Sequence, residues 1–302
     1  MKELLLLVLL CADYTWVTSQ AELCSVSPSI RFPLDLLKKH YEYNYPRIPL
    51  EKNLPMLNQG ECGVSKNDQS KQIINGKDAP ANAWPWQVWV VGAAGMCGGS
   101  IIHRQWIVTA GHCFEGENVV KVYHGNNIKR NGNITMTDRQ ILVERNDDAT
   151  AIDMALFRLT SPLSFSDSVQ PICLPEGNVW DASPCFLTGW GMMSGGGYPD
   201  ILQQIRVKIL NQSVCKAFQG VIGGIEQVNN YFCTEAVDTP NGEYRGASYG
   251  DSGGPVSCLK NGRYYLVGVK AFAIDLDGTF MNFESTVSRN VDIINGLIRK
   301  YS

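Results

Sequence analysis

The chain has 302 residues, of which 44% are hydrophobic and 18% are charged, a composition typical of a globular protein with a sizeable core. Its 26 Lys and Arg residues against 29 Asp and Glu residues give a formal net charge of -3, without a long basic run. This balance gives no electrostatic reason to expect nucleic acid or an anionic membrane as a partner. It favours a protein or a small molecule instead.

The first residues predict a secretory signal peptide. Residues 4–10 form an unbroken apolar run behind Lys2, and small residues follow at Thr18 and Ser19. The alternative is a membrane anchor, but the run is far shorter than the about 20 residues that cross a bilayer. We therefore expect residues 1–19 to be removed and the mature protein to be secreted, extracellular and without a membrane partner.

The next segment, residues 20–72, is rich in Pro, Asn, Tyr and charge and has no sustained period of 2 or 3.6 residues, which predicts a flexible pro-segment. From Trp84 onward, short β-rich runs alternate with Gly, Pro and Asn turns. The expected strands are Gln87–Val91, Ile101–Thr109, Val119–Tyr123, Gln140–Glu144, Met154–Leu159, Gln204–Leu210, Val256–Leu259 and Tyr264–Phe272. Many short strands favour an all-β barrel or sandwich. The clearest helix signal is at the end of the chain, where Asn290 can cap a segment with Val291, Ile294 and Ile298 on one face.

A candidate nucleophile lies in the segment Gly250-Asp-Ser-Gly-Gly-Pro. A serine hydroxyl is a poor nucleophile unless a base takes its proton and donors stabilise the resulting oxyanion. The backbone N–H groups of Gly250 and Ser252 are suitably placed in the sequence to be those donors. A glycine-rich turn between strands is the alternative interpretation of this segment alone.

A candidate base and its carboxylate partner lie earlier in the chain. Of the four histidines, His112 follows an apolar strand within Thr109-Ala-Gly-His-Cys, where small residues and a cysteine would fix the imidazole. Asp153 opens the apolar strand Asp-Met-Ala-Leu-Phe, and a carboxylate there can orient an imidazole and stabilise its charged form. Taken alone, His112 could be a structural or merely exposed histidine, and Asp153 could be a strand-start aspartate that makes backbone hydrogen bonds. In the order His, Asp, Ser they predict a catalytic triad.

These segments resemble the chymotrypsin/trypsin (S1-type) serine protease family over about residues 62–302. The matching stretches are Ile73-Ile-Asn-Gly, Pro85-Trp-Gln-Val, Cys97-Gly-Gly-Ser, Thr109-Ala-Gly-His-Cys, Asp153-Met-Ala-Leu, Gln170-Pro-Ile-Cys-Leu-Pro, Thr188-Gly-Trp-Gly and Gly250-Asp-Ser-Gly-Gly-Pro. The resemblance implies two packed six-stranded antiparallel β-barrels with a C-terminal helix, and a trypsin-like protease domain over 73–302. The triad would lie in the cleft between the barrels.

The resemblance also implies a set of disulfides. The implied pairs are Cys97 with Cys113, Cys185 with Cys258, Cys215 with Cys233, and Cys62 with Cys173. Cys11 would leave with the signal peptide, so Cys24 is then left over, and it can be free, removed or joined covalently to another chain. Two sequons, at Asn133 and Asn211, predict glycosylation on the secretory route.

Activation in this family resembles a charge switch, in which a cut creates a new α-amino group at Ile73 that pairs with Asp251. The residue before Ile73 is Gln72, where the family usually has Arg or Lys, so a trypsin-like activator would cut after Lys71 and leave one residue too many. We expect an unusual activating protease or later trimming of Gln72.

The predicted substrate pocket departs from the family in several places. Gly246 maps to the pocket floor, so the aspartate that gives trypsin its preference for Arg and Lys is absent. Ala271 replaces a serine, Phe272 replaces a tryptophan, and Ser248 replaces one cysteine of a bracing disulfide. The other implied lining residues are Ala273, Asn282 and Glu284. Glu284 can either meet a basic substrate side chain or be hydrogen-bonded internally.

The sequence therefore predicts a secreted serine endopeptidase, made as a zymogen, that cleaves protein substrates through His112, Asp153 and Ser252. No cofactor or metal is expected, because Asn126 to Thr137 lacks the carboxylates of a trypsin-type calcium loop. The alternative is a catalytically weak or silent homologue that binds a partner through the same fold.

Overall fold

The computed structural model describes residues 62–67, 77–92, 95–114, 119–143, 152–177, 183–193, 196–222, 230–237, 250–276 and 279–302. The predicted signal peptide, most of the predicted pro-segment, Cys24, Gln72, Ile73, Gly246 and Ser248 lie outside these residues.

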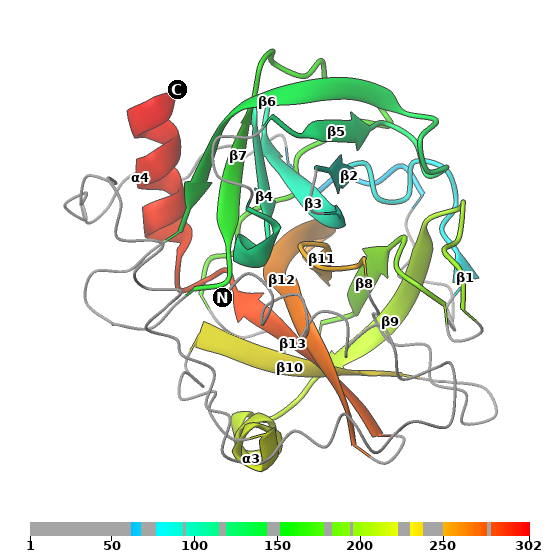
Figure 1. The fold of residues 1–302 in the computed structure, drawn as a ribbon, viewed down its shortest axis with the longest axis vertical. Helices are drawn as coiled ribbons and strands as arrows, with labels where there is room; N and C mark the ends of the chain where they lie inside the picture. The colour runs from blue at the N-terminus through cyan, green and yellow to red at the C-terminus, as the bar shows by residue number, and fades with distance from the viewer. Residues whose placement is uncertain are drawn as a thin grey trace, which may run out of the picture. The chain divides into compact units, whose positions relative to one another are not determined.

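The first barrel is a closed antiparallel sheet in the order β2-β3-β4-β7-β6-β5, in the upper half of Figure 1. Its strands are β2 (Gln87–Val91), β3 (Met96–His103), β4 (Trp106–Thr109), β5 (Lys121–His124), β6 (Asn133–Leu142) and β7 (Ala155–Leu159). Strand β4 is buried along its whole length, which agrees with its unbroken run Trp-Ile-Val-Thr. The expected single strand Ile101–Thr109 is wrong, because the chain reverses at Arg104 and Gln105 and forms β3 and β4.

The second barrel closes in the order β8-β9-β10-β13-β12-β11, with β8 also paired to β9. Its strands are β8 (Cys185–Gly189), β9 (Gln203–Ile209), β10 (Tyr231–Ala236), β11 (Pro255–Lys260), β12 (Arg263–Leu276) and β13 (Thr279–Thr286). The short strand β1 (Lys77–Asp78) adds to β9 outside the ring. The prediction of two six-stranded antiparallel barrels is therefore confirmed.

Helices are few in the described part of the chain, as the sequence predicted. They are a 3-10 turn at Gly111–Cys113, α3 (Gln212–Ile222) and α4 (Val291–Tyr301). Neither α3 nor α4 is long and apolar enough to cross a bilayer. Asn290 is the N-cap residue of α4, but its side-chain amide donates to Thr286 O at 2.8 Å instead of capping the helix. Ile294 and Ile298 are buried, as the predicted apolar face requires.

The two barrels are joined by an aromatic cluster. Trp84 and Trp86, just before β2, lie with their ring centroids 5.1 and 5.4 Å from that of Tyr264 on β12. Their indole N–H groups donate to Gln204 Oε1 at 2.6 Å and to Ser257 Oγ at 3.1 Å, both in the second barrel. Because buried indole N–H groups need such partners, these bonds fix how the first barrel lies against the second.

Four disulfides reinforce this frame, and they are the four pairs that the family resemblance implied. They join Cys62 to Cys173, Cys97 to Cys113, Cys185 to Cys258 and Cys215 to Cys233. The first one spans 111 positions and holds residues 62–67 to the segment before β8.

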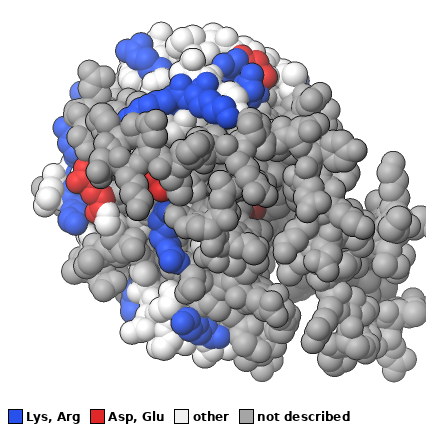
Figure 2. All heavy atoms as spheres, turned by 90° about the vertical axis from the view of Figure 1, so that its left-hand side faces the viewer, with Lys and Arg blue, Asp and Glu red and all other residues white. Residues whose placement is uncertain are grey.

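Charge is unevenly distributed on the described surface. Lys and Arg side chains gather in the upper part of the face shown in Figure 2, the part of the molecule that holds the first barrel and α4. Two cations lie on the aromatic ring of Tyr301 in α4, with Arg139 4.7 Å and Lys300 5.1 Å from its centroid. The contact of Arg139, which lies in β6, therefore contributes to holding α4 against the first barrel.

Candidate active site

His112 and Asp153 are brought together at the open ends of neighbouring strands. His112 lies in the 3-10 turn that follows β4, and Asp153 lies two residues before β7, the strand paired with β4. His112 Nδ1 lies 2.8 Å from Asp153 Oδ2, and the His112 backbone N–H donates to Asp153 Oδ1 at 2.7 Å. The carboxylate therefore holds both the ring and the backbone of the histidine.

The small residue at Gly111 makes this approach possible. A methyl group at Gly111 would come within 3.0 Å of Asp153 Oδ1 and 2.9 Å of Met154 N. Real Cβ atoms essentially never approach backbone so closely, so a larger residue would push the turn away from β7.

The His112 pKa is raised above its ordinary value. Burial lowers the pKa of the ring, but the hydrogen bond and the negative charge of Asp153 together outweigh burial. The imidazole side chain is nevertheless 48% exposed, against 18% for Asp153. One edge of the ring is thus held by the carboxylate while the side chain keeps access to solvent.

Two second-barrel residues hold the backbone of Asp153. Ser285 Oγ donates to Asp153 O at 2.9 Å, and the Tyr231 hydroxyl is hydrogen-bonded to the Asp153 backbone and to Ser285. Burial is the main reason that the pKa of Tyr231 is raised, so this hydroxyl remains protonated. The sequence analysis missed both residues, because a lone Tyr or Ser within a strand has no motif around it.

Ser252 lies on a turn of the second barrel that touches the end of β4. The Ser252 carbonyl oxygen accepts a hydrogen bond from Gly98 N at 2.7 Å, and Gly98 O accepts one from Thr109 Oγ1 at 2.8 Å. The next residue, Gly253, has a φ of 80° and is so close that a methyl group there would collide with Thr109. The segments that carry Ser252 and His112 are therefore neighbours in space.

The predicted oxyanion and activation residues are partly described. Gly250 has a φ of 95°, a conformation that a glycine adopts without strain, and directly precedes Asp251. Asp251 is 7% exposed, and its Oδ1 accepts a hydrogen bond from Gly191 N at 2.7 Å. Ile73, its predicted partner, lies outside the described residues.

The implied pocket residues lie on the paired strands β12 and β13. Ala273 is exposed, whereas Ala271, Asn282 and Glu284 are buried. Glu284 Oε1 accepts a hydrogen bond from Thr234 Oγ1 at 2.9 Å, so at least one of its oxygens is used inside the barrel. Gly246 lies outside the described residues.

Lys270 is a further residue of this region that sequence reasoning missed. It is 2% exposed and is the Cα partner of Glu284 in the β12–β13 register. A signal was available, since a lysine interrupts the apolar run Leu266-Val-Gly-Val and a glutamate interrupts the neighbouring strand. Such a pair of interruptions indicates two buried charges on neighbouring strands.

The sequons at Asn133 and Asn211 both lie on exposed residues. Asn133 begins β6, while Asn211 Oδ1 accepts from Ser213 N at 3.0 Å and thereby caps the start of α3. No group of three His, Cys, Asp or Glu side chains that could hold a metal ion occurs within the described ranges.

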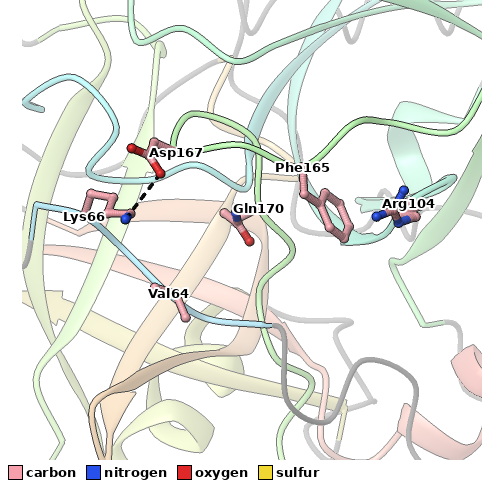
Figure 3. A pocket seen from close by; sticks show the side chains of 6 residues that line it. All are labelled: Val64, Lys66, Arg104, Phe165, Asp167 and Gln170. Atoms are coloured by element: carbon pink, nitrogen blue, oxygen red, sulfur yellow. Dashed lines mark ion pairs between the residues drawn. The ribbon is translucent and has the colours of Figure 1, made fainter.

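A cavity of about 360 Å³ lies elsewhere, lined by Val64, Lys66, Arg104, Phe165, Asp167 and Gln170 (Figure 3). Lys66 and Asp167 form an ion pair of 3.4 Å across it, and both side chains are largely exposed. None of the predicted site residues lines this cavity.

The comparisons with known proteins agree with the motifs. Residues 73–294 match the model of a protein family described as Trypsin. The chain is also similar to Transmembrane protease serine 11G of Rattus norvegicus, with 33% identity over 251 residues, 79% of this chain and 58% of the relative. Its similarity to Serine protease filzig of Drosophila melanogaster is 31% over 246 residues, 73% of this chain and 14% of that protein. The matched region is thus little more than half of the first relative and a small part of the second.

Proposed function

Since this chain belongs to the trypsin family of proteins, we propose that it is a serine endopeptidase that cleaves protein substrates through an acyl-enzyme intermediate. The observation that carries the proposal is the double hold of Asp153 on His112, at 2.8 Å on Nδ1 and 2.7 Å on the backbone N–H. With Nδ1 occupied in this way, Nε2 is the ring nitrogen left to accept a proton.

In the proposed mechanism His112 Nε2 takes the proton of Ser252 Oγ as the oxygen bonds to the substrate carbonyl carbon. The charge that develops on the carbonyl oxygen is stabilised by the N–H groups of Gly250 and Ser252. His112 then gives its proton to the leaving amine as the C–N bond breaks. A water molecule attacks the ester by the same route in reverse, which releases the acid and restores Ser252.

We further propose that the chain is made as a zymogen. The carboxylate of Asp251 lies so close to Gly189 and Gly191 that a methyl group at either would collide with it, and a new amino group at Ile73 would be its partner after cleavage. The Cys62–Cys173 disulfide would keep a cut pro-segment attached to the enzyme. Sequencing of the active protein from its new N-terminus tests this proposal, and a start at Gln72 contradicts it.

Labelling with a fluorophosphonate tests the proposed activity. Protein processed at Ile73 is expected to be labelled once, at Ser252, and a Ser252→Ala variant is expected to remain unlabelled. The second candidate function is that of a silent homologue that binds a partner, which Ala271 and the buried Lys270 favour because they alter the predicted pocket. Absence of label in correctly processed, folded protein would support that role.

Secretion is part of the proposal and has a specific alternative. The rat relative is named as a transmembrane protease, so membrane attachment is the competing outcome for this chain. Expression in cultured cells distinguishes the two. Secretion predicts protein in the medium with residues 1–19 removed and glycans at Asn133 and Asn211, whereas attachment predicts protein in the membrane fraction.

A further inference from the structure

Lys270 is a buried cation attached directly to the segment that carries Ser252. Its backbone N–H donates to Gly254 O at 2.9 Å, and its carbonyl oxygen accepts from Gly253 N at 2.8 Å. Gly253 and Gly254 are the two residues that follow Ser252. The position of the Lys270 side chain is therefore fixed relative to the proposed nucleophile.

The ammonium group of Lys270 lies among the residues predicted to line the substrate pocket. Nζ donates to Phe272 O at 2.6 Å and to Asn282 Oδ1 at 2.9 Å. Asn282 and Glu284 are only 1% and 0% exposed. The lysine side chain therefore lies beside Asn282, one of the residues that the family resemblance implies for the substrate pocket.

Glu284 is a buried carboxylate that is incompletely satisfied. Thr234 donates to Oε1, while Oε2 has no hydrogen-bond partner among the described residues. Burial raises the pKa of Glu284 to about 7, and the charge of Lys270 opposes that rise. Burial lowers the pKa of Lys270 to about 8, against the opposing charges of Glu284 and Asp251. Each member of the pair is thus the nearby charge that makes the other tolerable in the barrel.

We propose that Lys270 is a specificity-determining residue whose side chain takes the place in front of Glu284 that a basic substrate side chain would need. The assignment rests on the proposed function, since it concerns the side chain next to the scissile bond. With Lys270 present, a Lys or Arg residue of a substrate would meet a like charge and an occupied space. Shortening Lys270 removes both obstacles and leaves a buried carboxylate without its cation.

Binding of benzamidine, a small planar cation without a peptide bond, tests the proposal independently of catalysis. We expect wild-type protein processed at Ile73 to bind benzamidine weakly or not at all in titration calorimetry. Lys270→Ala should bind it at least about 10-fold more tightly, and Lys270→Ala/Glu284→Gln should lose that gain because the attracting charge is gone. Lys270→Met is the matched control, because it removes the charge but keeps most of the volume, and it should not bind.

Three results overturn the proposal. The first is that the wild type binds benzamidine as tightly as Lys270→Ala does. The second is that the double variant binds it as tightly as Lys270→Ala does. The third is that Lys270→Ala melts as a folded protein but shows no gain in affinity for benzamidine. If Lys270→Ala does not fold, the wild-type measurement still decides, since submillimolar binding by the wild type contradicts an occupied site. Fluorophosphonate labelling of the same wild-type sample distinguishes failure of the Lys270 proposal from failure of the proposed protease activity.

In the active protein the same change has a kinetic consequence. Lys270→Ala should raise kcat/KM for peptides with Arg before the scissile bond by at least about 10-fold relative to matched peptides with Ala there. An unchanged ratio in a variant that does bind benzamidine would contradict the placement of this site next to the scissile bond.

Discussion

Replacing the buried pair by neutral residues of similar shape, in Lys270→Met/Glu284→Gln, is expected to change how stability depends on pH. The ordinary pKa of Glu284 is 4.5 and burial raises it to about 7, so the folded protein holds this proton more tightly than the unfolded chain does. The difference corresponds to about 3 kcal/mol of unfolding free energy. This contribution is fully present below pH 4.5 and is lost as the pH rises through about 7.

The lysine acts in the opposite direction. Its pKa falls from 10.5 to about 8 on burial, so the corresponding stability is present above pH 10.5 and is lost as the pH falls through about 8. Relative to the double variant, wild-type protein should therefore be least stable between about pH 7 and 8. At that pH the free energy of unfolding of the double variant should be equal to that of the wild type or higher by about 1–4 kcal/mol. Each single variant should have a lower free energy of unfolding than the wild type.

Guanidinium denaturation with the disulfides intact measures this difference. Both proteins should carry Ser252→Ala to prevent self-cleavage, and unfolding should be followed from pH 4.5 to 8 by fluorescence. The wild type should lose about 3 kcal/mol relative to the double variant over this range. A difference that stays constant from pH 4.5 to 8 would show that Glu284 does not carry a raised pKa, and the reasoning about the buried pair would be wrong.

Three further changes test the rest of the frame. Asp153→Asn should lower the His112 pKa measured by NMR, because the carboxylate charge that raises it is removed, and an unchanged value would contradict their coupling. Replacing Cys62 and Cys173 by Ser should cost about 2–4 kcal/mol in denaturation, since the bond closes a loop of 111 positions, and an unchanged midpoint would refute a stabilising role. Gly253→Ala should lower the melting temperature and abolish fluorophosphonate labelling, because its φ of 80° and its contact with β4 leave no room for a methyl group, and normal labelling would argue against that contact.

The sequence predicts the strands best where turn residues flank them. Strand β2 agrees with the expected run Gln87–Val91 because Pro85 precedes it and Gly92 follows it. Strands β3 and β4 were merged because Arg104 and Gln105, which form the turn between them, carry no turn signal. Local sequence alone cannot place a reversal that is determined by pairing in the barrel.

Two further misses, β13 and α3, have a different physical origin. Strand β13 was not predicted because Asn282 and Glu284 interrupt its apolar pattern, and only the fold shows that each accepts a hydrogen bond within the barrel. Helix α3 was missed because Asn211 was interpreted only as a glycosylation acceptor, although its side chain also caps the helix. In each case a polar residue has a hydrogen-bond partner or a capping role that the local sequence does not reveal.

The candidate site likewise has residues that local motifs mark and residues that only the fold reveals. Short motifs predicted His112, Asp153 and Ser252, and the structure places Asp153 against His112. The contacts that second-barrel residues make with Asp153 could not be predicted from local motifs, since Ser285 is 132 positions from Asp153 in the sequence. Tyr231, likewise, has no motif that marks it.

Trp84 and Trp86, which lie between the barrels, can serve as intrinsic fluorescence probes of the barrel interface. Trp84 and Trp86 are 4% and 0% exposed, and their indole N–H groups are bonded to the opposite barrel. If the barrels parted, even with each sheet intact, these two rings would enter water and their emission would shift to longer wavelength. Time-resolved fluorescence could therefore detect opening of the interface without any attached dye.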